Sequence, residues 1–270
     1  MKGWVAILAL LLACACVEQT AKLEGGGTIS VELPGGALME MVWIEPGRFT
    51  MGTPTAQARR LRQAGLWNEV AETELPARSV RIERGFYLGR FEVTQRQWKS
   101  VTGTKPWLGL DYTLDRPRHP AVYISWTDVQ QFILHLNVGA GAEVFRLPTE
   151  AEWEYACRAG SDGVWSFGDN PRQLDDYAWY LPNSWALGWT SGRPVGTKAP
   201  NAWGLYDMHG NVWEWCQDWG AFPDPEGGYL PVLKGGSFFN EASNVRSAGR
   251  IRNDPDFRFG DIGVRLVRVP

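Results

Sequence analysis

Histidine and cysteine, the side chains that most often hold transition metals, are scarce in this sequence. Its 270 residues include three histidines and four cysteines, and two of the cysteines lie within the first 16 positions. The formal net charge is −3, so the basic excess of a nucleic-acid-binding protein is also missing. The chain contains no Gly-rich phosphate loop and no Ser–His–Asp order. We therefore expect no nucleic-acid partner and neither of these common catalytic sites.

A hydrophobic run long enough to cross a membrane is missing as well. The N-terminal apolar run Val5–Ala13 has nine residues, whereas a membrane-spanning helix needs about 20. A basic residue precedes this run and Cys14 follows it, an arrangement that resembles a bacterial lipoprotein signal. We interpret residues 1–13 as a signal peptide and Cys14 as the lipid-carrying residue. An ordinary secretory signal, cut after Ala13 or Ala15, is the alternative.

The residues after Cys14 predict how the protein is attached. Cys14 is followed by Ala15 and not by an aspartate. In bacteria with two membranes, this resemblance favours attachment to the outer membrane. A polar stretch with three consecutive glycines follows, so we interpret residues 14–38 as a lipidated N-terminus and linker. Residues 39–270 are the predicted folded domain. We expect it on the surface of the bacterial cell envelope, held to the membrane by the N-terminal lipid.

Tryptophan, glycine and proline are abundant, with 15, 31 and 17 residues. This composition favours loops held together by large aromatic side chains over long helices. Thr94, Ser125 and Thr149 each stand three residues before Gln, Asp or Glu, a pattern typical of helix starts. Apolar segments on both sides of Glu45–Gly47 predict a hairpin, and residues 80–93 predict a pair of strands.

Several segments, taken together, resemble the formylglycine-generating enzyme (sulfatase-modifying factor) family. In chain order they are residues 41–52, 86–94, 119–126, 146–156, 204–215, 235–237, 246–248 and 262–266. They occur in family order, so the resemblance extends over about residues 40–268. It implies an α+β, C-type-lectin-like fold that is rich in loops, with few helices and short strands.

The oxidases of this family use two cysteines that follow a Gly-Gly-Ser motif and bind copper, a metal that thiolates favour. In this chain the corresponding stretch, residues 238–245, contains no cysteine. Another branch of the family uses iron held by histidines, but His119, His135 and His209 are widely spaced here. We therefore expect no copper, no iron and no catalytic residue, and we interpret His209 as a structural hydrogen-bonding group. A formylglycine-generating or related oxidase is the alternative.

Cys157 and Cys216 lie in other motifs of the family. In some members the position of Cys157 is bonded to a cysteine that stands where this chain has Ser247. Since that partner is missing, the sequence allows two possibilities: a Cys157–Cys216 disulfide, or two buried thiols.

A calcium site is also implied by the resemblance. Asp207, Gly210, Val212 and Glu214 match positions that hold a calcium ion in the family through side-chain and backbone oxygens. Hard oxygen ligands around a tight glycine turn suit this ion, so we expect one structural calcium as a cofactor. In the alternative, Asp207 and Glu214 are only hydrogen-bonded within a tryptophan-rich corner.

The C-terminal segment, residues 235–268, alternates between motif residues and a second set of side chains. That set is aromatic, Asn, Asp, Ile or Gly, and it contains no Lys, Gln, Met or Trp, nor Glu if Glu241 counts as framework. Such a composition resembles the variable regions of ligand-binding proteins that retroelements diversify by randomising adenines. A fixed loop is the alternative. The candidate ligand-binding residues are Phe238, Phe239, Asn240, Asn244, Ile251, Asn253, Asp254, Asp256, Phe257, Phe259 and Asp261.

Phenylalanine supplies apolar contact area and Asn and Asp supply adaptable hydrogen bonds, a mixture related to that of antibody paratopes. For Phe238 and Phe259 the alternative is that their side chains point into the core. We expect a monomeric, non-catalytic lipoprotein that binds an external protein or cell-surface ligand through residues 238–261. A structural subunit of an envelope complex is the other alternative.

Overall fold

The computed structural model describes residues 26–221 and 228–270. The predicted signal peptide, Cys14 and the first part of the predicted linker lie outside the described residues. Within the described part, no helix is long and apolar enough to cross a membrane. β1 (Thr28–Glu32) pairs along its length with β2 (Leu38–Ile44). The residues before position 39 that the structure describes thus include a strand of the main sheet, within the segment that we interpret as linker.

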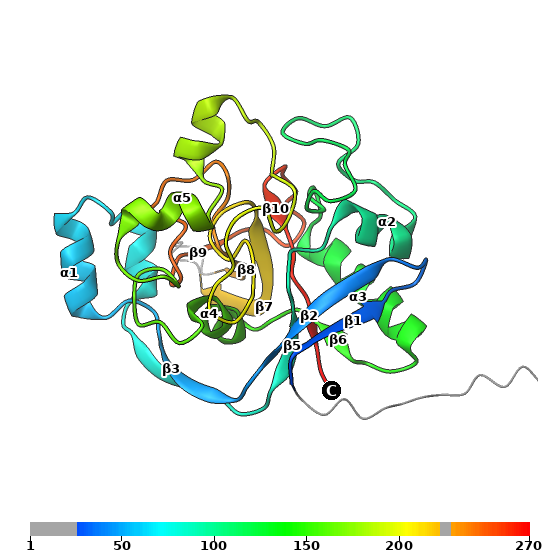
Figure 1. Cartoon of the computed structure of the whole chain (residues 1–270), viewed down its shortest axis with the longest axis horizontal. Helices are drawn as coiled ribbons and strands as arrows, with labels where there is room; N and C mark the ends of the chain where they lie inside the picture. Colours follow the sequence, from blue (N-terminus) through cyan, green and yellow to red (C-terminus); the bar gives the residue numbers. More distant parts are fainter. Residues whose placement is uncertain (1–25, 222–227) are drawn as a thin grey trace, which may run out of the picture.

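Three sheets form the framework of the molecule (Figure 1). The five-stranded sheet has the order β1–β2–β5–β11–β6 and is antiparallel throughout, with β5 (Phe86–Gly89), β6 (Phe145–Arg146) and β11 (Val267–Arg268). The second sheet has the order β10–β7–β8–β9, with β7 (Trp213–Ala221), β8 (Tyr229–Lys234), β9 (Arg250–Arg252) and β10 (Ile262–Gly263). β3 (Gly47–Met51) and β4 (Arg78–Ile82) form the third.

The strand pairing differs from the predicted hairpins. β2 and β3 flank the predicted turn but join different sheets, and so do β4 and β5. Both edges of β2 are already occupied, by β1 and β5, so β3 has no edge of β2 to pair with. The predicted hairpin around Glu45–Gly47 and the predicted strand pair within residues 80–93 are therefore wrong. Alternation identified these strands but carries no information about their partners.

All three predicted helix starts are confirmed. Thr94, Ser125 and Thr149 each accept a hydrogen bond from the backbone three residues on, and the side chain at that position bonds back to the cap. The α-helices are α1 (Thr55–Gln63), α2 (Gln95–Thr102), α3 (Trp126–Ala140), α4 (Glu150–Arg158) and α5 (Leu174–Tyr177). Short 3₁₀ helices span Glu69–Glu74, Pro171–Gln173, Leu181–Asn183 and Trp185–Leu187.

The main hydrophobic core is formed by the five-stranded sheet, helices α2 and α3, and strands β7, β8 and β10 of the second sheet. Trp98 of α2 and Phe132 of α3 stack in it with their ring centroids 4.7 Å apart. The largest fully buried side chains include Trp107, Trp153, Trp165 and Trp215. Much of the tryptophan therefore holds loops and helices together, and the few helices and short strands confirm the predicted α+β class.

Candidate ligand-binding surface

Buried ion pairs fix the C-terminal segment to the rest of the fold. The Arg246 guanidinium donates to both carboxylate oxygens of Glu74, at 2.6 and 2.9 Å. Arg265 bonds Glu214 at 2.8 Å, and all four side chains are at most 2% exposed. Because a buried charge without its partner is costly, these motif residues hold residues 235–268 in one position.

The residues between these anchors divide into exposed and buried ones. Phe257, Asp254 and Asp256 are exposed, whereas Phe239, Asn253 and Phe259 are half-buried. Ile251 lies in β9 and packs against the main core. The amide oxygen of Asn240 accepts from the Ser237 backbone, and that of Asn244 accepts from the Asn68 amide, so both also have structural contacts.

Two predicted ligand-binding residues are not at the surface. Phe238 is fully buried and its ring lies 4.2 Å from that of Phe239. Asp261 is also buried, and its carboxylate accepts a 2.6 Å hydrogen bond from the Ser237 hydroxyl. The ligand-binding prediction for Phe238 is therefore wrong, and its alternative place in the core is the one observed, because a fully buried side chain cannot contact an external ligand. Asp261 keeps only 8% of its surface exposed, and its carboxylate is held by the Ser237 hydroxyl. Phe259 keeps part of its ring exposed.

Five aromatic side chains from three chain segments form one cluster, which we call the aromatic face. Its members are Tyr112, Trp185, Phe239, Phe257 and Phe259. The Tyr112 ring lies 5.2 Å from Phe239 and 5.4 Å from Phe259, and the Trp185 ring lies 4.7 Å from Phe239. All five keep part of their surface exposed. A partly exposed cluster of this kind marks an interaction site.

The sequence did not predict Tyr112 or Trp185 as binding residues, because neither lies in a recognised motif. Tyr112 is in the loop of residues 103–117, and Trp185 begins a 3₁₀ helix. One signal was present: Leu108, Leu110 and Leu114 place apolar side chains in a loop, and all three are exposed. Apolar residues in a segment that predicts neither helix nor strand indicate an interaction surface.

Close backbone contact holds the 103–117 loop against the C-terminal segment. A Cβ atom at Gly260 would lie 2.8 Å from the Tyr112 Cβ and 3.2 Å from the Asp111 carbonyl oxygen, so only glycine fits. The Tyr123 hydroxyl donates to that same Asp111 oxygen at 3.0 Å, and its backbone N–H donates to the Phe259 carbonyl. The aromatic face is therefore positioned before any ligand arrives.

Four acidic residues lie within three sequence positions of members of the aromatic face. Asp111, Glu241, Asp254 and Asp256 are exposed, and none of them forms an ion pair within the described residues. Arg258 lies between Phe257 and Phe259 in the sequence, and its guanidinium is paired with Asp128 at 2.7 Å. Exposed carboxylates therefore flank the aromatic residues along the chain, and we call these four residues the acidic rim.

The predicted calcium ligands lie together in a buried corner, where both carboxylates already accept hydrogen bonds. Both oxygens of Glu214 accept from the Arg265 guanidinium, and one also accepts from the Trp153 indole at 2.6 Å. Asp207 accepts from the Gly196 N–H at 2.7 Å, while its Oδ1 is buried and has no partner in the described structure. Within the described residues, no three His, Cys, Asp or Glu side chains gather as metal ligands.

Arg265 thus supplies the positive charge that calcium would bring. Gly210 and Val212 lie in the buried connection into β7, and the Gly210 N–H donates to the Gly235 carbonyl. Burial raises the pKa of Asp207 to about 6, and the neighbouring Glu214 charge acts in the same direction. The geometry supports the hydrogen-bonded corner, and calcium stays a prediction.

The two described cysteines are free, buried thiols. Burial raises the pKa of Cys157 to about 12 and also raises that of Cys216, so neither forms the reactive thiolate. His209 accepts from the Ser166 backbone N–H through Nε2 and donates from Nδ1 to the Val245 carbonyl. The structural role predicted for His209 is confirmed, and of the two possibilities for the cysteines the structure has the buried thiols.

Comparisons with known proteins find similarity both to formylglycine-generating enzymes and to a protein named as variable. The formylglycine-generating enzyme of Thermomonospora curvata is 36% identical over 198 residues, which are 64% of this chain and 61% of that enzyme. The solved structure of Treponema denticola variable protein 1 has a TM-score of 0.74 and 25% identity, covering 90% of this chain and 99% of that one. PvdO from Pseudomonas aeruginosa has a TM-score of 0.72 and 26% identity, covering 92% and 99%.

These similarities support the fold that the sequence resemblance implied. Residues 31–270 match the sulfatase-modifying factor enzyme 1-like domain, which is nearly the whole described chain. The aligned chains include a named enzyme and a named variable protein, so the shared fold alone does not select an activity. The chain belongs to the sulfatase-modifying factor enzyme 1-like family.

Proposed function

We propose that this chain is a non-catalytic binding protein of the bacterial cell envelope that holds an external protein on its aromatic face. The observation that carries the proposal is the cluster itself. Tyr112, Trp185, Phe239, Phe257 and Phe259 come from three distant segments, yet their rings touch and remain partly exposed. Aromatic anchors of this kind dominate the binding energy of protein interfaces.

The acidic rim indicates the chemistry of the partner. Asp111, Glu241, Asp254 and Asp256 carry charges that no basic side chain pairs within the described residues. Lysine and arginine side chains would satisfy these carboxylates, and they also bind over aromatic rings through cation–π contacts. We therefore assign a basic protein surface as the partner.

An oxidase is the weaker alternative. The stretch 238–245, which corresponds to the region where the oxidases of the family have their two cysteines, contains no cysteine here. Cys157 and Cys216 are buried thiols with raised pKa values, so they do not replace that pair. An oxygen-consumption assay with added copper and a cysteine-containing sulfatase peptide tests this directly, and turnover would overturn the binding proposal.

Retroelement diversification of this surface is part of the proposal. The motif residues Arg246 and Arg265 are buried in ion pairs, whereas Asn253, Asp256 and Phe257 between them reach the surface. This division keeps the fold constant while the exposed side chains change. We expect an imperfect copy of codons 235–268 beside a reverse-transcriptase gene, with differences only at adenines of the template copy. A genome without that copy would reduce the proposal to a fixed binding loop.

Attachment to the outer membrane through Cys14 also belongs to the proposal and rests on the sequence pattern alone. Mass spectrometry of the mature N-terminus should find a lipid-modified Cys14 as its first residue. Stable co-purification with envelope subunits, unaffected by changes on the aromatic face, would favour the structural-subunit alternative instead. We expect the isolated chain to be monomeric.

Panning a random peptide library against the full chain tests the binding surface. We expect enrichment of peptides rich in Lys and Arg, and roughly 10- to 100-fold weaker binding of the selected peptides to Trp185→Ala and Phe257→Ala, because each change removes an exposed anchor. Asp254→Asn with Asp256→Asn should flatten the salt dependence of binding. Leu38→Ala is the matched control, since Leu38 is exposed on β2. Equal binding by all these variants would refute the assigned surface.

A further inference from the structure

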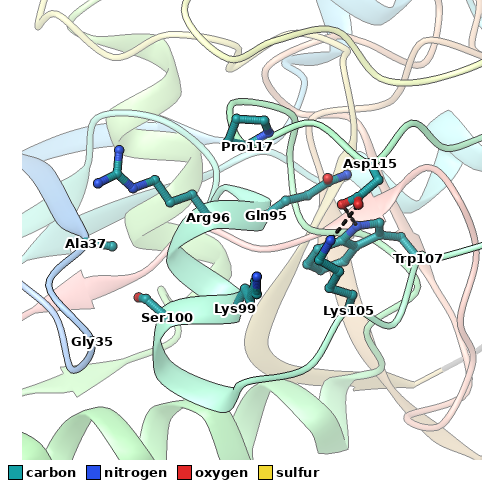
Figure 2. Close-up of a pocket in the computed structure, with 10 residues that line it drawn as sticks. All are labelled: Gly35, Ala37, Gln95, Arg96, Lys99, Ser100, Lys105, Trp107, Asp115 and Pro117. Atoms are coloured by element: carbon teal, nitrogen blue, oxygen red, sulfur yellow. Dashed lines mark hydrogen bonds and ion pairs between the residues drawn. The ribbon is translucent and has the colours of Figure 1, made fainter.

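A pocket of about 400 Å³ lies between α2, the 103–117 loop and the β1–β2 connection, and neither the family resemblance nor the proposed function uses it. Figure 2 shows Arg96 and Lys99 on α2 and Lys105 on the loop, with Lys105 beside Asp115 and the Arg96 side chain directed away from it. Trp107, which is almost fully buried, forms part of its wall. The volume is suited to a small molecule or a lipid headgroup.

The charge of the lining is positive although the chain as a whole is acidic. The charged residues that line the pocket are three cations, Arg96, Lys99 and Lys105, and a single carboxylate, that of Asp115. Asp115 accepts from Lys105 at 2.5 Å and from the Trp107 indole at 3.1 Å, as the dashed lines in Figure 2 show. Arg96 and Lys99 form no ion pair in the described part of the chain. Among the described residues Arg96 therefore has no ion-pair partner and Lys99 acts on Asp115 without a direct ion pair, in a chain whose net charge is −3.

The walls of the pocket are held by contacts that do not use these cations. The buried Gln95 amide donates to the Leu114 carbonyl, and its oxygen accepts from the Arg116 N–H, so α2 fixes the loop. On the other side, Gly35 passes so close to α2 that a Cβ there would lie 2.3 Å from the Ser100 carbonyl oxygen. The free donors of Arg96 and Lys99 are thus presented by a fixed framework.

We propose that this pocket binds an oxyanion of the phosphate type, either on a free small molecule or as a phospholipid headgroup. Arg96 and Lys99 supply charge-assisted hydrogen bonds to the anion, whereas the Ser100 hydroxyl on the same helix already donates to the Gln97 carbonyl. Asp115 already shows the preference of the site for negative charge. Hydrogen bonds from Lys105 and Trp107 hold the pKa of its carboxyl below the ordinary value, and Lys99 acts in the same direction.

Calorimetric titration of the full chain in detergent tests the site with three probes. These are inorganic phosphate, glycerol 3-phosphate and dihexanoyl-phosphatidylglycerol below its micellar concentration. We expect saturable binding that weakens about tenfold in Arg96→Gln and in Lys99→Gln, because each change removes one charge-assisted contact. Arg59→Gln is the matched control, since Arg59 is an exposed, unpaired arginine on α1 within the described residues.

The probes also decide between the two sources of the anion. Tighter binding of the short-chain lipid than of glycerol 3-phosphate assigns a membrane headgroup, whereas the reverse order assigns a free phosphate compound. The inference would be overturned if Arg96→Gln and Lys99→Gln bound the probes as tightly as the wild type does, or if no probe showed saturable binding. The outcome is independent of peptide binding on the aromatic face, so either proposal can fail alone.

Discussion

Replacing Arg265 with methionine is expected to lower the free energy of unfolding by about 3–5 kcal/mol. Arg265 is fully buried and donates to both oxygens of Glu214, to the Gly89 carbonyl and to the Tyr206 carbonyl. Methionine fills much of the same volume but leaves the Glu214 carboxylate buried without its counter-charge. Urea unfolding followed by tryptophan fluorescence measures the loss.

Two further carboxyl groups make this loss larger than that of an ordinary ion pair. Glu92 and Asp207 are buried nearby, and each has one oxygen with no partner in the described structure. Burial raises the pKa of both, while the Arg265 charge acts against that rise. Without Arg265, three carboxyl groups would share one apolar corner.

Arg258→Met is the control, because it removes the same guanidinium from an exposed pair. Arg258 and Asp128 are both more than 30% exposed, and such pairs contribute up to about 1 kcal/mol. The double variant Arg265→Met/Glu214→Gln should recover part of the loss, since it removes the stranded charge as well. Equal losses in Arg265→Met and Arg258→Met would contradict the buried network.

The same unfolding curves test the calcium prediction. A structural calcium ion at Asp207 and Glu214 would make the free energy of unfolding fall when EDTA is added to the wild type. If Arg265 alone supplies the positive charge, as the geometry of this corner suggests, EDTA leaves the curve unchanged.

Acid should remove about 3 kcal/mol of stability through His209 alone. Burial lowers the pKa of His209 from the ordinary 6.5 to about 4. The neutral ring is required, because Nε2 accepts the Ser166 N–H and Nδ1 donates to the Val245 carbonyl. A histidine held neutral contributes stability that is complete above pH 6.5 and is lost as the pH falls from 6.5 to about 4.

Other buried groups oppose this effect, so the wild-type curve by itself does not isolate it. Burial raises the pKa values of Asp207 and Asp261 to about 6, and these groups favour the folded state as the pH falls from 6 towards 4. The measurement is therefore the difference in unfolding free energy between wild type and His209→Gln at each pH. That difference should shrink by about 3 kcal/mol between pH 7 and pH 4. A constant difference would show that His209 does not titrate in this range.

Local sequence signals determined the secondary structure well. The caps at Thr94, Ser125 and Thr149 depend on residues three positions apart. Each interaction therefore lies within one short sequence segment. The order of short motifs likewise indicated the family and the α+β class before any coordinates were known. The lack of cysteine in residues 238–245 was visible at once and argues against oxidase chemistry.

Contacts between distant segments were decided only by the tertiary structure. The sequence marked Phe238 and Phe239 alike, but packing buries the first ring and leaves the second beside Tyr112 and Trp185. It paired β2 with β3, although β1 and β5 already occupy both edges of β2. The sequence by itself determined the caps, the family and the missing thiols, since these depend on neighbouring residues or on composition. The aromatic face and the Arg265–Glu214 pair required the fold, because burial and long-range contact arise only when separate segments meet.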